Sequence, residues 1–168
     1  MKVPYFSQQT LYTCGPAATR MVLKFYGVLK SEKELTKALK TAPQNGTSFT
    51  TVKKYAKKLG LRCVIHHNIR PQEKGLERLR EYATNGIPTM VTVNRYVYDK
   101  KTLGINQNVK WESKNFSYHI VVVTKIDENN AYFNDPHKIM KRAIVPIKKF
   151  MKAWYSGKWD GYIVAITK

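Results

Sequence analysis

Apolar side chains recur at helical spacing early in the chain and form strand-like runs later. In residues 14–26 they return every three or four positions, and Gly27 ends the pattern, which predicts a helix. Ser31 with Glu34 three residues later is typical of a second helix start. Further helices are predicted over 48–59, 72–84 and 148–155. Strands rich in β-branched residues are predicted over 61–67, 87–94, 118–125, 131–134, 142–147 and 161–167.

This order of elements predicts the fold class. Helices dominate first and strands later, which favours an α+β fold with an N-terminal helical layer packed on a C-terminal antiparallel sheet. It argues against an alternating, doubly wound parallel sheet. The length of 168 residues and the lack of repeats or linkers predict a single domain over 1–168. A polar stretch, 96–116, separates two predicted strands, and loops of that length are often functional.

Charge adds a question about partners. Thirty Lys and Arg stand against 11 Asp and Glu, which gives a net charge of +19. Such a field attracts anionic partners, namely nucleic acid, an acidic membrane or an acidic substrate, although a solvated lysine-rich surface has the same composition. No apolar run is long enough for a transmembrane segment, and no signal peptide opens the chain, so we expect a cytoplasmic protein.

Cys14 is the first candidate for chemistry. It is followed by Gly15-Pro16 at the start of the first predicted helix, where unpaired N–H groups and the helix dipole stabilise a thiolate nucleophile. Gly15 would let a substrate backbone approach closely, which makes it a candidate substrate-binding residue. An inert, buried cysteine at a helix start is the alternative. A single bridge to Cys63 is also arithmetically allowed.

A nucleophilic cysteine needs a base and an orienting group. His119 opens the most strand-like run, and Asp135 ends a later strand before Pro136. A hairpin with its turn near Glu128 would bring the carboxylate beside the imidazole and hold it in the required tautomer. A sheet-edge histidine and a turn aspartate are the alternatives. The remaining histidines, which we interpret as surface residues, are His66, His67 and His137.

Gln8 precedes Cys14 by six residues and completes the set. Its side-chain amide, together with the backbone N–H of Cys14, is a candidate oxyanion donor. No second ligand pair accompanies Cys63 and His66, so the sequence predicts neither a metal nor a cofactor.

These residues resemble a known family. The segments Val3-Pro4-Tyr5-Phe6-Ser7-Gln8, Cys14-Gly15-Pro16-Ala17-Ala18 and Phe25-Tyr26-Gly27 look like the opening of family thirty-nine of the cysteine peptidases. These are the papain-like, bacteriocin-processing peptidases and their stand-alone relatives. The resemblance implies a papain-like fold and a peptidase acting on a peptide or protein. It also implies the site roles: Cys14 as nucleophile, His119 as base, Asp135 as its orienting partner and Gln8 as oxyanion donor.

Other functions stay open at this point. Relatives cut leader peptides after a double glycine, and nothing in the sequence shows that specificity. Some similar papain-like domains are acyltransferases or have lost activity. The rival from another class is a basic nucleic-acid-binding module, for which Lys53, Lys54, Lys57 and Lys58 on one predicted helix are the main signal.

Overall fold

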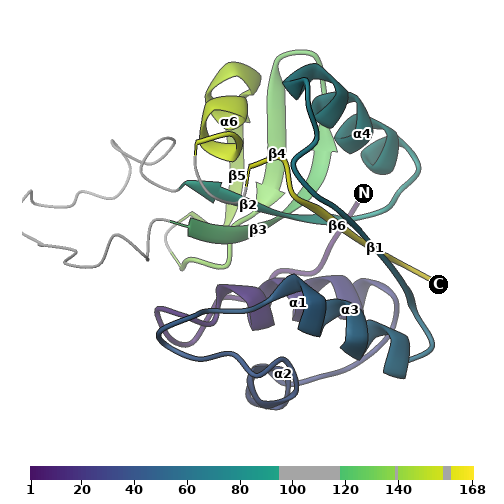
Figure 1. Cartoon of the computed structure of the whole chain (residues 1–168), viewed down its shortest axis with the longest axis vertical. Helices are drawn as coiled ribbons and strands as arrows, with labels where there is room; N and C mark the ends of the chain where they lie inside the picture. Colours follow the sequence, from purple (N-terminus) through teal and green to yellow (C-terminus); the bar gives the residue numbers. More distant parts are fainter. Residues whose placement is uncertain (95–117, 139, 157–159) are drawn as a thin grey trace, which may run out of the picture.

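The computed structural model describes residues 1–94, 118–138, 140–156 and 160–168, which form a sheet with helices on both faces (Figure 1). The helices are α1 (Cys14–Phe25), α2 (Glu32–Ala38), α3 (Phe49–Lys58), α4 (Gln72–Thr84) and α6 (Ile147–Trp154). The strands are β1 (Arg62–His66), β2 (Thr89–Asn94), β3 (Tyr118–Ile126), β4 (Asn130–Asn134), β5 (Arg142–Pro146) and β6 (Ile163–Thr167). The sheet order is β1-β6-β2-β3-β4-β5, and every neighbouring pair is antiparallel. The predicted polar loop, 96–116, lies outside the described residues.

The helix starts follow from local chemistry. At α2, the hydroxyl of Ser31 accepts a hydrogen bond from the Glu34 N–H at 3.1 Å, and the Glu34 carboxylate accepts one from the Ser31 N–H at 2.7 Å. This reciprocal pair satisfies two N–H groups that the helix leaves unpaired. At α3, the hydroxyl of Ser48 accepts from the Thr50 N–H at 3.3 Å. Both helices therefore begin where the sequence predicts.

The central strands of the sheet are buried on both faces, as β3 shows. Ile120 and Val122 pack into one core, shared with α1, α2 and α3. Val121 and Val123 point the other way, into a second core shared with α4 and α6. Alternate side chains of a strand face opposite sides of the sheet, so a strand between two cores reads as a continuous apolar run. The predicted helical layer on an antiparallel sheet is confirmed, and α4 with α6 adds a layer on the opposite face (Figure 1).

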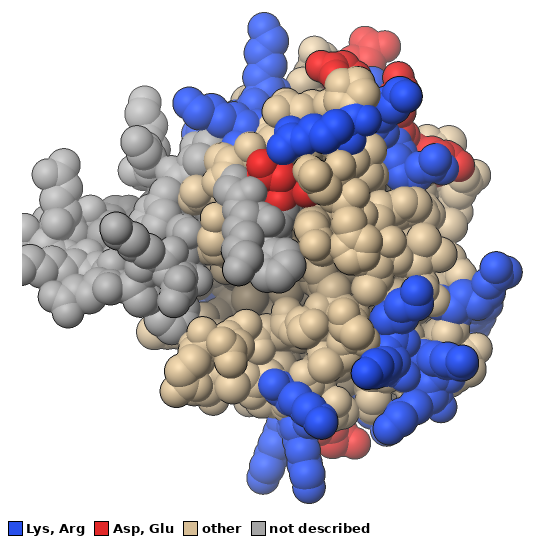
Figure 2. Space-filling model, in the orientation of Figure 1, with Lys and Arg blue, Asp and Glu red and all other residues tan. Residues whose placement is uncertain are grey.

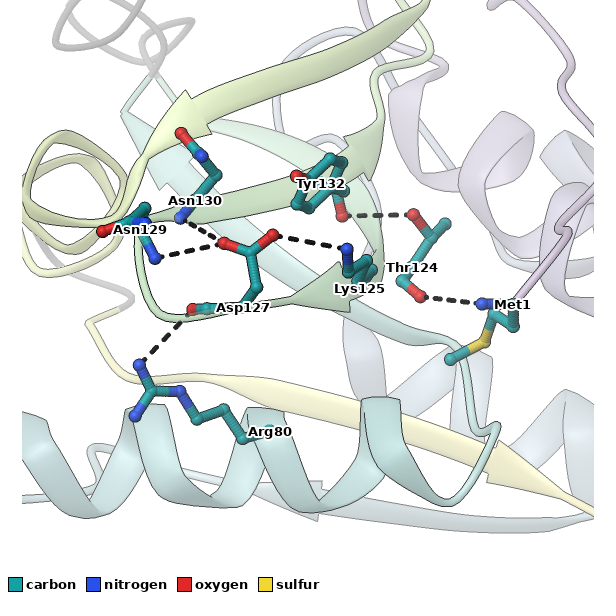
Figure 3. A network of polar contacts seen from close by, with 8 residues as sticks. All are labelled: Met1, Arg80, Thr124, Lys125, Asp127, Asn129, Asn130 and Tyr132. Carbon is teal, nitrogen blue, oxygen red and sulfur yellow. Dashed lines mark hydrogen bonds and ion pairs between the residues drawn. The ribbon is translucent and has the colours of Figure 1, made fainter.

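A tight connection joins β3 to β4. The Asp127 carboxylate accepts hydrogen bonds from the backbone N–H groups of Asn129 at 3.1 Å and Asn130 at 2.8 Å (Figure 3). It also pairs with Lys125 at 3.3 Å. The hydrogen bond from Tyr132 and these N–H groups lower the pKa of Asp127 to about 2. The turn therefore fixes the first pairs of the hairpin, and an irregularity between Val123 and Lys125 then shifts the register by one residue before the end that carries the site.

The N-terminal segment is tied to the same hairpin. The Met1 amine donates to the carbonyl of Thr124 on β3 at 3.4 Å (Figure 3). The side-chain amide of Asn134, at the end of β4, donates to the carbonyl of Val3 at 3.2 Å. These contacts lead the chain toward the end of β4 before α1 begins. Among the described residues, no helix is both long and apolar enough to cross a bilayer.

Candidate active site

Cys14 is the first residue of α1 and is partly exposed. The preceding loop is closed by Thr13, whose hydroxyl accepts from the Thr10 N–H at 3.1 Å. The following residues, Gly15 and Pro16, are buried inside the first helical turn. The thiol therefore lies at the positive end of the helix dipole, where a thiolate is favoured.

The surroundings of Cys14 favour its ionised form. Burial alone would raise the pKa of the thiol. His119 opposes this effect through its hydrogen bond and its charge, and backbone hydrogen bonds from Ile120 and Gly15 act in the same direction. Together they leave the pKa of the Cys14 thiol below its usual value. Cys63 shows the contrast, because burial raises its pKa to about 11 and the charge of Lys53 opposes this only in part.

The hairpin brings His119 and Asp135 together. Val122 pairs with Asn134, so Asp135 lies one step beyond, on the diagonal from His119 across the two strands. The imidazole Nε2 and the carboxylate Oδ1 are 2.5 Å apart, and the two residues are 5% and 0% exposed. Because Nε2 is engaged, Nδ1 is the ring nitrogen left for Cys14.

This pairing sets the charge of His119. Burial would lower the pKa of the imidazole, but the charge of Asp135, its hydrogen bond and the contact with Cys14 raise it to about 10. A histidine pKa raised beside a thiol whose pKa is lowered favours a thiolate–imidazolium pair at neutral pH.

Gln8 lies beside this pair. It is 7% exposed, and its side-chain Nε2 donates to the carbonyl of Thr10 at 2.7 Å. An amide nitrogen carries two protons, so one N–H remains for another acceptor. The backbone N–H of Gln8 donates to the carbonyl of Pro136 at 2.8 Å, which ties Gln8 to the loop that holds Asp135. The structure thus brings together all four residues that the sequence singled out.

A cleft of about 480 Å³ opens at these residues. Gln8, Cys14 and His119 line it together with residues 43–50, which run from the α2–α3 connection into the first turn of α3. An aromatic wall also contributes: the rings of Phe49 and Tyr162 stack with centroids 6.2 Å apart, and His67 meets Tyr162 edge-on at 4.7 Å. The cleft therefore offers both polar and apolar surface to an extended chain.

Gly15 has a different neighbour from the one expected. It is buried, and a Cβ added there would lie 2.3 Å from the Thr47 Oγ1. Thr47 lines the cleft and is fixed by a 2.7 Å hydrogen bond to the hydroxyl of Thr41. The need for glycine is explained by this packing within the protein, while contact between Gly15 and a substrate stays a prediction.

Two histidines are more enclosed than the surface positions that the sequence indicated. His137 is half-buried, lines the cleft, and donates its backbone N–H to Asp135 Oδ1 at 2.7 Å. An aspartate that accepts from the N–H two residues later forms a common local turn, so Asp-Pro-His was the signal available in the sequence. His66 is also half-buried, since its ring nitrogen bonds to the hydroxyl of Tyr82 at 2.8 Å. His67 is exposed, as predicted, although it lies at the cleft.

Metal ligation and disulfide formation have no support in the part of the chain that the structure describes. Both cysteines are free thiols. No group of three or more His, Cys, Asp or Glu side chains comes together among the described residues.

The fold and this arrangement define a class. A cysteine at a helix start, facing a buried histidine on an antiparallel sheet, is the arrangement of papain-like thiol hydrolases. Residues 1–159 match the model of the Peptidase_C39 like family, and the chain belongs to this family. Membership places the chain among the cysteine peptidases.

Solved structures share the fold. The peptidase domain of Streptococcus ComA, a bifunctional ABC transporter, is 23% identical, with a TM-score of 0.71 over 99% of this chain and 98% of that one. A C39-like peptidase from Bacillus anthracis is 20% identical, with a TM-score of 0.73 and 99% and 95% coverage. A double-glycine-motif protease from an AMS/PCAT transporter, solved with its leader peptide, is 20% identical, with a TM-score of 0.69 and 99% and 91% coverage. No curated protein matches the chain.

Proposed function

We propose that residues 1–168 form a single peptidase domain in which Cys14, His119, Asp135 and Gln8 carry out peptide-bond hydrolysis. The observation that carries this proposal is the contact chain from Cys14 through His119 to Asp135. The buried imidazole of His119 lies between the Cys14 thiol, whose pKa is lowered, and the Asp135 carboxylate, which raises the pKa of the imidazole. Structural ion pairs rarely expose a low-pKa thiol to a cleft, whereas a thiol nucleophile requires it.

In the first half of the proposed reaction, the Cys14 thiolate attacks the carbonyl carbon of the scissile bond. A carbon–sulfur bond forms, and the carbonyl π electrons move onto oxygen. The backbone N–H of Cys14 and the free N–H of the Gln8 amide donate to that oxyanion. His119 then gives its proton to the amine as the carbon–nitrogen bond breaks, which leaves a thioester on Cys14.

In the second half, His119 removes a proton from water, and the resulting hydroxide attacks the thioester. The carbon–sulfur bond breaks, the acid product leaves, and the thiolate–imidazolium pair is restored. Asp135 holds the imidazole in one orientation throughout. An amine or thiol in place of water would make the same site an acyltransferase, which is the alternative reaction.

The proposed substrate is a peptide or protein segment bound in extended form. The solved AMS/PCAT relative holds a leader peptide, and its name gives a double-glycine motif. By family membership, we propose cleavage of a leader peptide after small residues for this chain as well. The cytoplasmic location stays a prediction.

The test is labelling with a peptidyl vinyl sulfone at pH 7, with mass spectrometry of each cysteine. We expect Cys14 to react at least ~10-fold faster than Cys63, because only a thiolate adds to this reagent and the Cys63 pKa lies near 11. His119→Ala should remove the difference, since it takes away the positive partner of the thiolate. Equal labelling of the two cysteines in the wild type would contradict the proposal and would favour an inactive member of the family.

A second candidate role is binding of nucleic acid, favoured by the charge distribution. Lys53, Lys54, Lys57 and Lys58 are all exposed along α3. Figure 2 shows Lys and Arg gathered on the side of the molecule where α3 ends. Affinity for duplex DNA should fall steeply with salt, and Lys53→Glu with Lys57→Glu should lower both affinity and the salt slope relative to Lys125→Glu. Binding to acidic vesicles alone would instead indicate a membrane partner, and binding to neither would overturn this role.

A further inference from the structure

We propose that Glu32 is a positioning residue that holds the segment carrying Gln8 in place and so sets the oxyanion donor beside Cys14. The inference rests on the proposed function. Glu32 touches neither Cys14 nor His119 in any contact that the structure describes, so its effect would reach the reaction only through Gln8.

Glu32 has an unusual place for an acidic residue. It is the first residue of α2, yet only 2% of its surface is exposed. Its Oε1 accepts a hydrogen bond from the backbone N–H of Gln9 at 2.8 Å, across 23 positions of sequence. The N-terminal end of α2 favours a negative charge there, which helps to retain the carboxylate in its buried position.

A role limited to stabilising α2 does not explain this placement. Ser31 and Glu34 already provide the capping box of that helix. The Oε2 of Glu32 is buried and accepts no hydrogen bond from the described residues. Burying a carboxylate with one unpaired oxygen costs free energy of folding. A buried glutamate at this position is therefore best explained by a contribution from its one side-chain hydrogen bond. That hydrogen bond is the one accepted from the backbone N–H of Gln9.

That N–H belongs to a segment braced on two sides. The backbone N–H of Gln8 donates to Pro136, in the loop that follows β4, and the adjacent N–H of Gln9 donates to Glu32, on α2. The two bonds hold consecutive peptide groups between the sheet and the helical layer. Without Glu32 the Pro136 bond is the one described backbone bond left on these two peptide groups. The Gln8 amide still donates to Thr10, but Thr10 belongs to the same segment, so Gln8 and Thr10 can shift together away from Cys14. Misplacing a catalytic group by 1 Å can reduce a rate about 100-fold.

Two small reagents separate this role from a general loss of structure. p-Nitrophenyl acetate acylates the thiolate through an oxyanion and releases p-nitrophenolate, so its rate depends on the oxyanion donor. Iodoacetamide alkylates the same thiolate by displacing iodide, with no oxyanion, so its rate reports only the Cys14–His119 pair. The ratio of the two rate constants at Cys14 therefore measures the oxyanion donor alone.

Glu32→Ala should lower this ratio by about 10- to 100-fold, with the alkylation rate close to that of the wild type. Glu32→Asp keeps the charge at the helix start but is one methylene too short to reach Gln9, so it should lower the ratio as well. The Glu32→Asp variant also provides the test if the Glu32→Ala variant does not fold. Glu32→Gln retains a side-chain oxygen that accepts from Gln9 and should keep the ratio within ~3-fold of wild type.

Glu34→Ala is the matched control, because it weakens the cap of α2 without touching the 8–13 segment. We expect it to lower the melting temperature and leave the ratio unchanged. An unchanged ratio in Glu32→Ala and Glu32→Asp, or an equal fall in Glu34→Ala, would overturn the role of Glu32. If wild-type Cys14 is acylated no faster than Cys63, which the Cys14→Ala protein reports, the proposed function itself fails.

Discussion

Replacing Cys14 by alanine should abolish hydrolysis of peptidyl-coumarin amides, with kcat/KM falling by at least ~10⁴-fold. The proposed reaction forms a covalent bond to this sulfur, and no other described thiol lies in the cleft. Cys63 is on β1, half-buried, and burial raises its pKa to about 11. The measurement is hydrolysis of a mixed library of such amides by wild-type and variant protein under identical conditions.

Cys63→Ala is the matched control for this loss. It removes the same group from a partly buried site in the same core, so it reports any cost of removing a thiol as such. We expect its kcat/KM to stay within ~3-fold of wild type. Hydrolysis that persists in Cys14→Ala, or that disappears in Cys63→Ala at unchanged melting temperature, would refute Cys14 as the nucleophile.

Local signals account for the part of the fold that the sequence predicted. The Ser31–Glu34 capping box and the Ser48 cap each fix a helix start through contacts within three residues. Continuous apolar runs marked the central strands such as β3, because both faces of the sheet are covered there. The layer of α4 and α6 was not predicted, since periodicity shows that a strand is buried but not which helices bury it.

In the site, too, contacts within one hairpin could be predicted from the sequence, whereas contacts between distant segments could not. His119 and Asp135 are joined by a hairpin with a short turn, so the sequence indicates that they lie near each other. Their exact alignment depends on the register shift between Val123 and Lys125, which the sequence did not predict. The contact of Cys14 with His119 came from the family resemblance, because more than a hundred residues separate the two. The bonds from Gln9 to Glu32 and from Gln8 to Pro136 join different layers, and no local pattern indicates them.

His137 shows why the remaining part was missed. Its position in a basic loop suggested a solvated side chain, yet the loop folds back so that its N–H caps Asp135. Loop residues acquire their contacts from the elements that the loop joins, and the composition of the loop alone does not indicate those contacts.

Asp135→Ala should reduce kcat/KM by at least ~100-fold, whereas Asp135→Asn should retain much more activity at neutral pH. Alanine leaves the His119 Nε2 and the His137 N–H without their shared acceptor. Asparagine supplies an oxygen in the same place, and papain-like sites are known to work with asparagine in this role. The difference between the two variants separates orientation of the imidazole from charge.

The charge of the Asp135 carboxylate should affect the pH dependence of kcat/KM. Burial lowers the pKa of His119, but Asp135 and Cys14 together raise it to about 10, and His119 in turn lowers the pKa of Cys14. The thiolate–imidazolium pair exists above the lowered thiol pKa and below the raised imidazolium pKa. Asp135→Asn removes the carboxylate charge, so the alkaline limb of kcat/KM should move to lower pH. With a lower pKa, His119 is less fully protonated and stabilises the Cys14 thiolate less, so the acid limb should move to higher pH. The pH range in which the enzyme is active therefore becomes narrower at both ends.

Asp127→Asn provides the control for this narrowing. It removes the same carboxylate charge at the opposite end of β4, where the contacts are with Lys125 and the turn N–H groups (Figure 3). Its pH profile should match the wild type, although its melting temperature should fall. An Asp135→Asn profile as wide as the wild type would mean that the charge on His119 has another source. A loss of activity in Asp135→Asn equal to that in Asp135→Ala would mean that the carboxylate acts through its charge and not by orienting the ring.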